Sequence, residues 1–249
     1  MLEIRNHGSV REIQMARPRA NAMNSEMIDA LNTELQSAAK EADAVVLSGL
    51  PGMFSAGLDV PELLGLERPA FTDFWHRFID LQRRIATLPV PVAFAMTGHA
   101  PAGGILLGVL GDHRIMPRGP YKTGLNEVHI GLVVPEPPFA ALVHLVGPRA
   151  ADTIISEGKL MLAEEAAGIG MIDELVDSVE DVVPRAIEWC EERLALPRDA
   201  MLQTREMARR YLHEFFDGYD EARGDRFIDI WFSEGTQKSL RGLVERLKK

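Results

Sequence analysis

The sequence predicts an α/β core followed by a purely helical region. Short apolar strands alternate with helical segments up to about residue 175. Beyond about residue 180 the pattern is only helical. The chain has 249 residues, of which 46% are apolar, which is enough to bury one core. We place the core at residues 1–195 and the helical region at 196–249.

The first elements are two strands, a helix and a third strand. Residues 2–16 read as two short strands around the turn His7-Gly8. Asn24 can cap a helix, and residues 44–47 read as a short buried strand before the loop 49–59. The apolar stripe of the helix consists of Met27, Ile28, Leu31, Leu35 and Ala38.

The following elements keep this alternation and then give way to helices. Residues 92–96 are a buried strand, 105–110 a buried helix whose first turn sits at two glycines, and 113–116 a strand. Pro197 and the Asp217-Gly218 turn divide the helical region. An earlier helical stretch contains aromatic residues that either line a ligand pocket or belong to the core: Phe71, Phe74, Trp75 and Phe78.

Composition excludes several classes of protein. The net charge of -10 disfavours nonspecific nucleic-acid binding. There is no apolar run of about 18 residues and no basic, apolar leader, so neither a membrane span nor a targeting segment is expected. The single cysteine, Cys190, excludes an internal disulfide and favours a reducing compartment, the cytoplasm. The seven histidines show no metal-binding spacing, so no metal site is expected.

Two loops with small residues can present backbone N–H groups to a ligand. In the segment 54–59, Ala56 and Gly57 leave the backbone open to a ligand oxygen. Gly103-Gly104 begins an apolar helix, whose first N–H groups lack partners within the helix. Two such donors on one carbonyl oxygen would stabilise an enolate. An ordinary loop and close helix packing are the alternative explanations of these glycines.

Carboxylates are scarce beside these loops. Asp112 is the only other one between Gly103 and Glu127, and its place at the far end of the helix indicates a structural role. Glu127 lies among apolar residues and is either a buried base or a solvent-facing glutamate. His99 and His129 flank the candidate site in sequence, with either a direct or a structural role. The basic C-terminal end, which either holds phosphates or forms a solvated helix face, consists of Lys238, Arg241, Arg246, Lys248 and Lys249.

A set of motifs extends along nearly the whole chain. These are Arg17-Pro18, Asn21-Ala22-Met23, Phe54-Ser55-Ala56-Gly57-Leu58-Asp59, Thr97-Gly98-His99-Ala100-Pro101-Ala102-Gly103-Gly104, Gly111-Asp112-His113-Arg114-Ile115, Gln237-Lys238-Ser239-Leu240 and Val244-Glu245-Arg246-Leu247. Each alone is only suggestive, but their order and spacing together are specific. With them the sequence resembles the crotonase superfamily, also called the enoyl-CoA hydratase/isomerase family.

This resemblance implies a fold, an assembly and a site. The fold would be a crotonase-like spiral of ββα units with a helical C-terminal trimerisation region, assembled as a homotrimer or a dimer of trimers. The core would hold an acyl-CoA thioester, with the Ala56 and Gly103 N–H groups as oxyanion donors. Coenzyme A is part of the substrate, so no separate cofactor is expected. The residues that the resemblance places beside the acyl-CoA are Arg19, Ala20, Ala56, Gly57, Leu58, Asp59, Val60, Gly103 and Arg246.

The acidic residues distinguish the reactions of the superfamily. The resemblance implies that a hydratase needs two glutamates around one water, one of them three residues after Gly103, where this chain has Leu106. The other matches Glu127. The segment Gly124-Leu125-Asn126-Glu127 is similar to the mitochondrial-type Δ3,Δ2-enoyl-CoA isomerases, in which one glutamate makes both proton transfers.

Chemistry supports the same choice. Moving a double bond from C3 to C2 removes a proton at C2 and returns one at C4, and one carboxylate can do both in turn. Leu106 makes the site drier, which raises the basicity of the carboxylate and slows water addition. We therefore expect a Δ3,Δ2-enoyl-CoA isomerase that uses Glu127 as acid and base. The alternatives are another acyl-CoA reaction (hydratase, thioesterase or decarboxylase) or a noncatalytic acyl-CoA binder.

Overall fold

The computed structural model describes residues 1–217 and 221–247. Gly218 of the predicted turn, and Lys248 and Lys249 of the basic end, lie outside the described residues. Among the described residues, no helix is both long and apolar enough to cross a membrane.

A six-stranded sheet forms the larger layer of the core, in the order β1-β2-β3-β5-β7-β10. Only the β1–β2 pair is antiparallel; every other neighbouring pair is parallel. The central strand β3 is buried along its whole length, which suits its near-continuous apolar sequence. The strands are β1 (Leu2–His7), β2 (Val10–Met15), β3 (Ala44–Ser48), β5 (Val92–Ala95), β7 (His113–Pro117) and β10 (Glu174–Val176).

A smaller sheet has the order β4-β6-β8-β9. In it β4 (Gly52–Met53), β6 (Gly98–Pro101) and β8 (Lys122–Gly124) run parallel, and β9 (Leu160–Leu162) is antiparallel to β8. Each consecutive strand pair β3/β4, β5/β6 and β7/β8 gives its first strand to the large sheet and its second to the small one. A helical segment follows each pair. This is the predicted repetition of ββα units, and the α/β fold class is confirmed.

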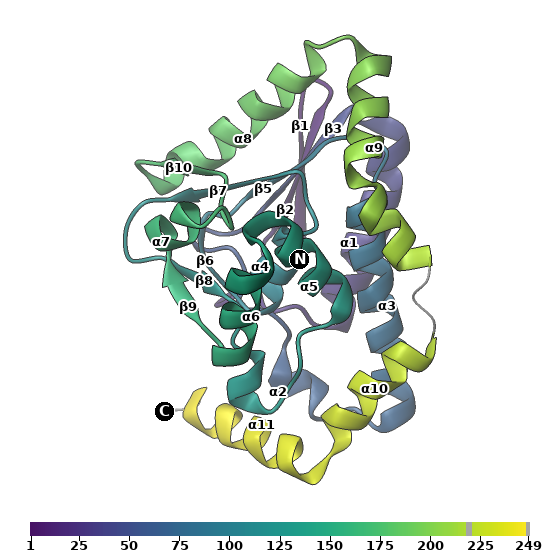
Figure 1. Ribbon diagram of the computed structural model, residues 1–249, viewed down its shortest axis with the longest axis vertical. Helices are drawn as coiled ribbons and strands as arrows, with labels where there is room; N and C mark the ends of the chain where they lie inside the picture. Colours follow the sequence, from purple (N-terminus) through teal and green to yellow (C-terminus); the bar gives the residue numbers. More distant parts are fainter. Residues whose placement is uncertain (218–220, 248–249) are drawn as a thin grey trace.

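Helices enclose both sheets. Helix α1 (Ser25–Glu41) is capped as predicted by Asn24, whose side chain accepts a hydrogen bond from the Met27 N–H. Helix α3 (Arg68–Thr87) packs on α1, and α8 (Val179–Leu194) contacts strands of the large sheet; Figure 1 shows them at different sides of that sheet. The shorter helical segments are α2 (Val60–Leu63), α4 (Gly103–Gly108), η1 (Glu127–Ile130), α5 (Glu136–Val146), α6 (Pro148–Glu157) and α7 (Ala163–Gly168).

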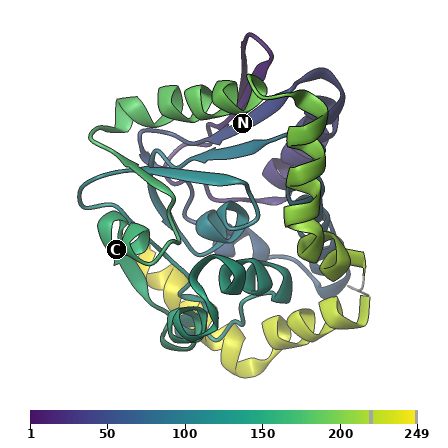
Figure 2. The same ribbon diagram turned by 45° about the horizontal axis from the view of Figure 1, so that its top comes forward.

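The C-terminal region is helical, as predicted. It contains α9 (Arg198–Asp217), α10 (Glu221–Phe232) and α11 (Glu234–Leu247). Helices α9 and α10 both pack on α3, while α11 contacts α2 and η1. Figure 1 shows α10 and α11 running beneath the core, and Figure 2 shows the same path after the turn. The last two helices therefore close the side of the core where η1 lies.

Candidate active site

Three loops meet at one edge of the small sheet. They follow β4, β6 and β8, which are adjacent and parallel, so their carboxyl ends share an edge. The loops contain residues 54–59, Ala102-Gly103 and 125–127. Hydrogen bonds join them at their bases, from the Phe54 N–H to the His99 carbonyl at 2.9 Å and from the Ala102 N–H to the Gly124 carbonyl at 2.8 Å. The topology therefore brings together the candidate residues of all three segments.

Backbone N–H groups in the first loop are almost all occupied. The Ala56 N–H donates to the Ala20 carbonyl at 2.9 Å, and the Gly57 N–H donates to Ser55 Oγ at 3.1 Å. The Asp59 N–H donates to the Met23 carbonyl at 3.0 Å. No described residue accepts a hydrogen bond from the Leu58 N–H. Because a backbone donor is rarely left without a partner, Leu58 is the residue of this loop that has a donor to offer.

This corrects the assignment of Ala56 as an oxyanion donor. Its N–H already holds the loop that contains Ala20 in place, so it cannot also bind a ligand oxygen. Sequence reasoning placed Leu58 only as a neighbour of coenzyme A. Leu58 is distinguished because the N–H groups of its neighbours Ala56 and Asp59 donate to the carbonyls of Ala20 and Met23. These hydrogen bonds join segments that are far apart in the sequence.

Gly103 supplies the second unpaired donor. It is the first residue of α4, so no carbonyl within the helix accepts its N–H, and none does among the other described residues. A Cβ atom on Gly103 would lie 3.3 Å from Leu58 N, and a Cβ on Gly57 would lie 2.8 Å from Gly103 N. The two loops thus touch, and the missing side chains leave Leu58 N and Gly103 N close to each other.

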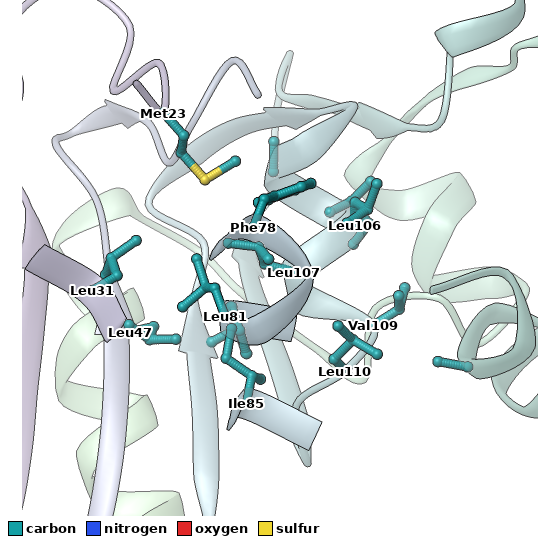
Figure 3. Packing of buried hydrophobic residues seen from close by; sticks show 14 of the residues in the cluster. Met23, Leu31, Leu47, Phe78, Leu81, Ile85, Leu106, Leu107, Val109 and Leu110 are labelled. Atoms are coloured by element: carbon teal, nitrogen blue, oxygen red, sulfur yellow. The ribbon is translucent and has the colours of Figure 1, made fainter. Parts of the chain in front are cut away.

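A cavity of about 820 Å³ opens onto these groups. Its wall includes Leu58, Gly103 and Glu127 together with Leu106. Leu106 is 3% exposed, and Figure 3 shows it among the packed apolar side chains of α3 and α4. An apolar side chain thus stands where a second glutamate would introduce a charge.

Glu127 is a buried carboxylate. It begins η1 and is 7% exposed. Its Oε2 atom has no hydrogen-bond partner. Burial raises the pKa of Glu127 to about 7, and its own backbone N–H opposes that rise. A carboxyl group with such a pKa can take up and release a proton near neutral pH.

Asp59, the other acid in the cavity wall, is already paired. Its Oδ2 lies 2.7 Å from a guanidinium nitrogen of Arg17, and its Oδ1 accepts the Glu62 N–H at the start of α2. Glu127 is therefore the only carboxylate in the described cavity wall without such partners.

The pKa of Glu127 predicts a pH-dependent stability difference. Below about pH 4.5 both the folded and the unfolded chain are protonated. As the pH rises to about 7 the folded chain holds this proton while the unfolded chain releases it, so stability falls. Relative to wild type, Glu127→Gln is expected to gain about 3 kcal/mol in free energy of unfolding between pH 4.5 and 8. Denaturant unfolding at several pH values measures this difference. The prediction is contradicted if the free energies of unfolding of wild type and Glu127→Gln change equally with pH.

An arginine-containing loop borders the cavity entrance. The positive φ angles of Arg19 (77°) and Asn21 (46°) bend it, and the Asn21 amide donates to the carbonyls of Met15 and Phe54 at 2.9 and 3.1 Å. Arg17 and Arg19 both line the cavity. Seven of the nine residues predicted beside the acyl-CoA line it: Arg19, Ala20, Ala56, Leu58, Asp59, Val60 and Gly103. Gly57 lies directly against Gly103.

Several other candidates lie outside the cavity wall. Arg246 is exposed, although its neighbours Leu243 and Leu247 on α11 line the cavity. His99 Nδ1 accepts the Lys122 N–H, and His129 Nε2 lies 2.9 Å from the Glu157 carbonyl, so both have structural partners. Asp112 is structural, as predicted, because it binds the Val92 N–H and two arginines of α9.

Aromatic residues of distant segments complete the wall. Trp75 and Phe78 of α3 line the cavity, whereas Phe71 and Phe74 do not. Phe227 and Trp231 of α10 line it as well. Sequence reasoning left the first pair undecided and did not connect the second pair to the site. No group of three or more metal-ligating side chains occurs among the described residues.

Comparison with known proteins identifies the family. Residues 5–249 match the family described as enoyl-CoA hydratase/isomerase. The chain belongs to this family, whose fold is the crotonase fold, and is thus an enzyme of the enoyl-CoA hydratase/isomerase type.

Both isomerases and hydratases are among its relatives. The chain is 28% identical to mouse mitochondrial enoyl-CoA delta isomerase 1, over 100% of this chain and 87% of that protein. It is 31% identical to a probable enoyl-CoA hydratase of Mycobacterium avium, over 75% of this chain and 73% of that protein. The crystal structure of human mitochondrial delta3-delta2-enoyl-CoA isomerase has a TM-score of 0.94 at 28% identity, covering 99% of this chain and 98% of the other.

Proposed function

We propose that the protein is a Δ3,Δ2-enoyl-CoA isomerase that uses Glu127 as its single acid–base group. The observation that carries this proposal is that the described cavity wall holds one carboxylate without an arginine partner, Glu127, on the same cavity as two unpaired N–H groups. Hydration needs a group to activate water and a group to protonate the α-carbon. Leu106 lines the cavity where the second glutamate of a hydratase would be expected. The likeness to mammalian enoyl-CoA delta isomerases supports the same choice.

The proposed reaction has two proton transfers. Glu127 removes a proton from C2, and the electrons of that C–H bond move onto the thioester oxygen. The Leu58 and Gly103 N–H groups stabilise the resulting dienolate. The carboxyl group then returns its proton to C4, the C2–C3 double bond forms, and Glu127 becomes ionised again. No water and no second acid are consumed.

The cavity entrance suits the rest of the substrate. Arg17 and Arg19 line the cavity next to the loop 56–60, and their positive charge can attract the phosphates of coenzyme A. Assembly into a homotrimer or a dimer of trimers belongs to the same proposal, and the mass of the protein in solution tests it.

Product analysis with 3-hexenoyl-CoA tests the reaction. We expect 2-hexenoyl-CoA, separated by chromatography and unchanged in mass, as the main product. A hydratase would instead convert 2-hexenoyl-CoA into a product heavier by one water, and a thioesterase would release free coenzyme A. Tight binding of every enoyl-CoA without any turnover would identify a noncatalytic binder and would contradict the proposal.

A further inference from the structure

We propose that Trp75 and Trp231 form an end wall that limits the length of the acyl chain. The inference rests on the proposed function, because it assigns the aromatic side of the cavity to the acyl group of the substrate. It concerns which substrates fit rather than how the double bond moves.

Burial gives the cavity a direction. Pro18, Arg19, Pro61 and Leu247 line it and are exposed, so the entrance lies on their side. Trp75 and Trp231 also line it, and they are 1% and 0% exposed. A substrate whose coenzyme A lies at the entrance and whose thioester lies at Leu58 N therefore directs its last carbon atoms toward the buried aromatic side.

The end wall is built from two helices that hold each other in place. The ring of Trp75 on α3 stacks on Phe227 of α10, with centroids 3.6 Å apart and planes at 1°. Trp231 on α10 stacks on Phe71 of α3 at 4.4 Å. An ion pair of 2.7 Å between Arg68 and Asp229 joins the same helices. Because stacking fixes both indole rings, the wall is expected to exclude long chains rather than yield to them.

The two indoles contribute shape and no hydrogen bonds. Trp75 Nε1 and Trp231 Nε1 are both buried, and neither has a hydrogen-bond partner. Replacing either residue with phenylalanine removes ring volume without leaving a partner unpaired. The planar ring that stacks on the neighbouring helix is retained. These two substitutions therefore test the effect of cavity length with little change in polarity.

The experiment compares acyl chains of increasing length in Trp75→Phe, Trp231→Phe and wild type. The substrates are 3-hexenoyl-, 3-octenoyl-, 3-decenoyl- and 3-dodecenoyl-CoA, and the readout is the ratio of kcat/KM for each chain to that for 3-hexenoyl-CoA. The fit of one methylene group in an apolar pocket changes kcat/KM by about 10–200-fold. In wild type, this ratio is expected to fall once the acyl chain is too long for the cavity. At the shortest chain that shows this fall, we expect the ratio to be about tenfold or more higher in each variant than in wild type.

Trp189→Phe is the matched control. Trp189 lies on α8, is also buried, and stacks on His113 rather than lining the cavity. The same change there should leave the chain-length profile as in wild type. An equal shift in this control would show a general effect of weakened packing and would overturn the proposal.

A binding measurement separates this inference from the proposed reaction. Saturated acyl-CoAs from hexanoyl- to dodecanoyl-CoA, titrated by calorimetry, report the fit of the chain without turnover. If both variants bind longer acyl chains more tightly than wild type does, and wild type has no isomerase activity, the end wall is supported and the isomerase is rejected. Active isomerase with unchanged profiles in both variants would overturn the end wall alone. If one variant fails to fold, the other decides.

Discussion

Glu127→Gln is expected to lower kcat for conversion of 3-hexenoyl-CoA to 2-hexenoyl-CoA by about 10²–10⁴-fold. An amide has the shape of the carboxyl group but cannot take a proton from C2 or return one to C4. KM should change little, because Oε2 makes no hydrogen bond that the substitution would break. Wild-type kcat/KM should rise with pH through about 7, where the free enzyme's Glu127 becomes ionised. Steady-state kinetics across pH measures both effects.

Glu12→Gln provides the contrast. Glu12 is also buried, but it accepts a hydrogen bond from Ser48 at 2.7 Å and pairs with His7 at 3.0 Å, away from the cavity. Its substitution should leave kcat unchanged and should lower stability, because a buried partner is removed. Turnover by Glu127→Gln at the wild-type rate would exclude Glu127 as the acid–base group.

Gly57→Ala is expected to lower kcat by about 10²–10³-fold, the loss typical of one missing oxyanion donor. A methyl group at position 57 would lie 2.8 Å from Gly103 N, closer than packed atoms tolerate. It would therefore cover or displace the Gly103 N–H. Single-turnover rates with saturating 3-hexenoyl-CoA measure the loss in the chemical step.

Gly52→Ala separates this effect from backbone strain. Gly52 has a φ angle of 84°, close to the 90° of Gly57, but a methyl group there would meet no atom within 4 Å. Both substitutions should cost stability, because a residue with a Cβ atom is strained at positive φ. Only Gly57→Ala should also lose catalysis. Equal losses of activity in the two variants would mean that strain, rather than a blocked donor, explains the result.

Five of the six strands of the large sheet could be predicted from the sequence, whereas β10, with three residues, was not. Strands such as β3 and β5 are buried on both faces and read as apolar runs, and α1 has both a cap and an apolar stripe. The small sheet could not be predicted in this way. Its strands β4 and β6 contain only two and four residues, with glycine or proline among them, so neither alternation nor β-propensity marks them.

The site was predictable only in part. Gly103 begins a helix, as its own segment indicated. The segment around Glu127 left a buried and a solvent-facing carboxylate open, and the resemblance to the family decided between them. The sequence did not predict that Leu58 rather than Ala56 has the free N–H group, because the Ala56 N–H donates to the carbonyl of Ala20 in a distant segment. Likewise, the stacking of Phe227 on Trp75 joins segments about 150 residues apart, and no pattern within either segment indicates it.

The hydrogen bond from the Ala56 N–H to the Ala20 carbonyl joins the donor loop (residues 54–59) to the arginine-containing loop. Ser55 adds a second hydrogen bond between the two loops by donating to the Asn21 carbonyl at 2.8 Å. In the proposed function, a substrate whose nucleotide binds Arg17 and Arg19 also holds the Leu58 N–H against the thioester carbonyl of the substrate. Binding energy from the nucleotide can then orient the reacting carbon atoms. A substitution in either loop is therefore expected to change both substrate binding and the rate.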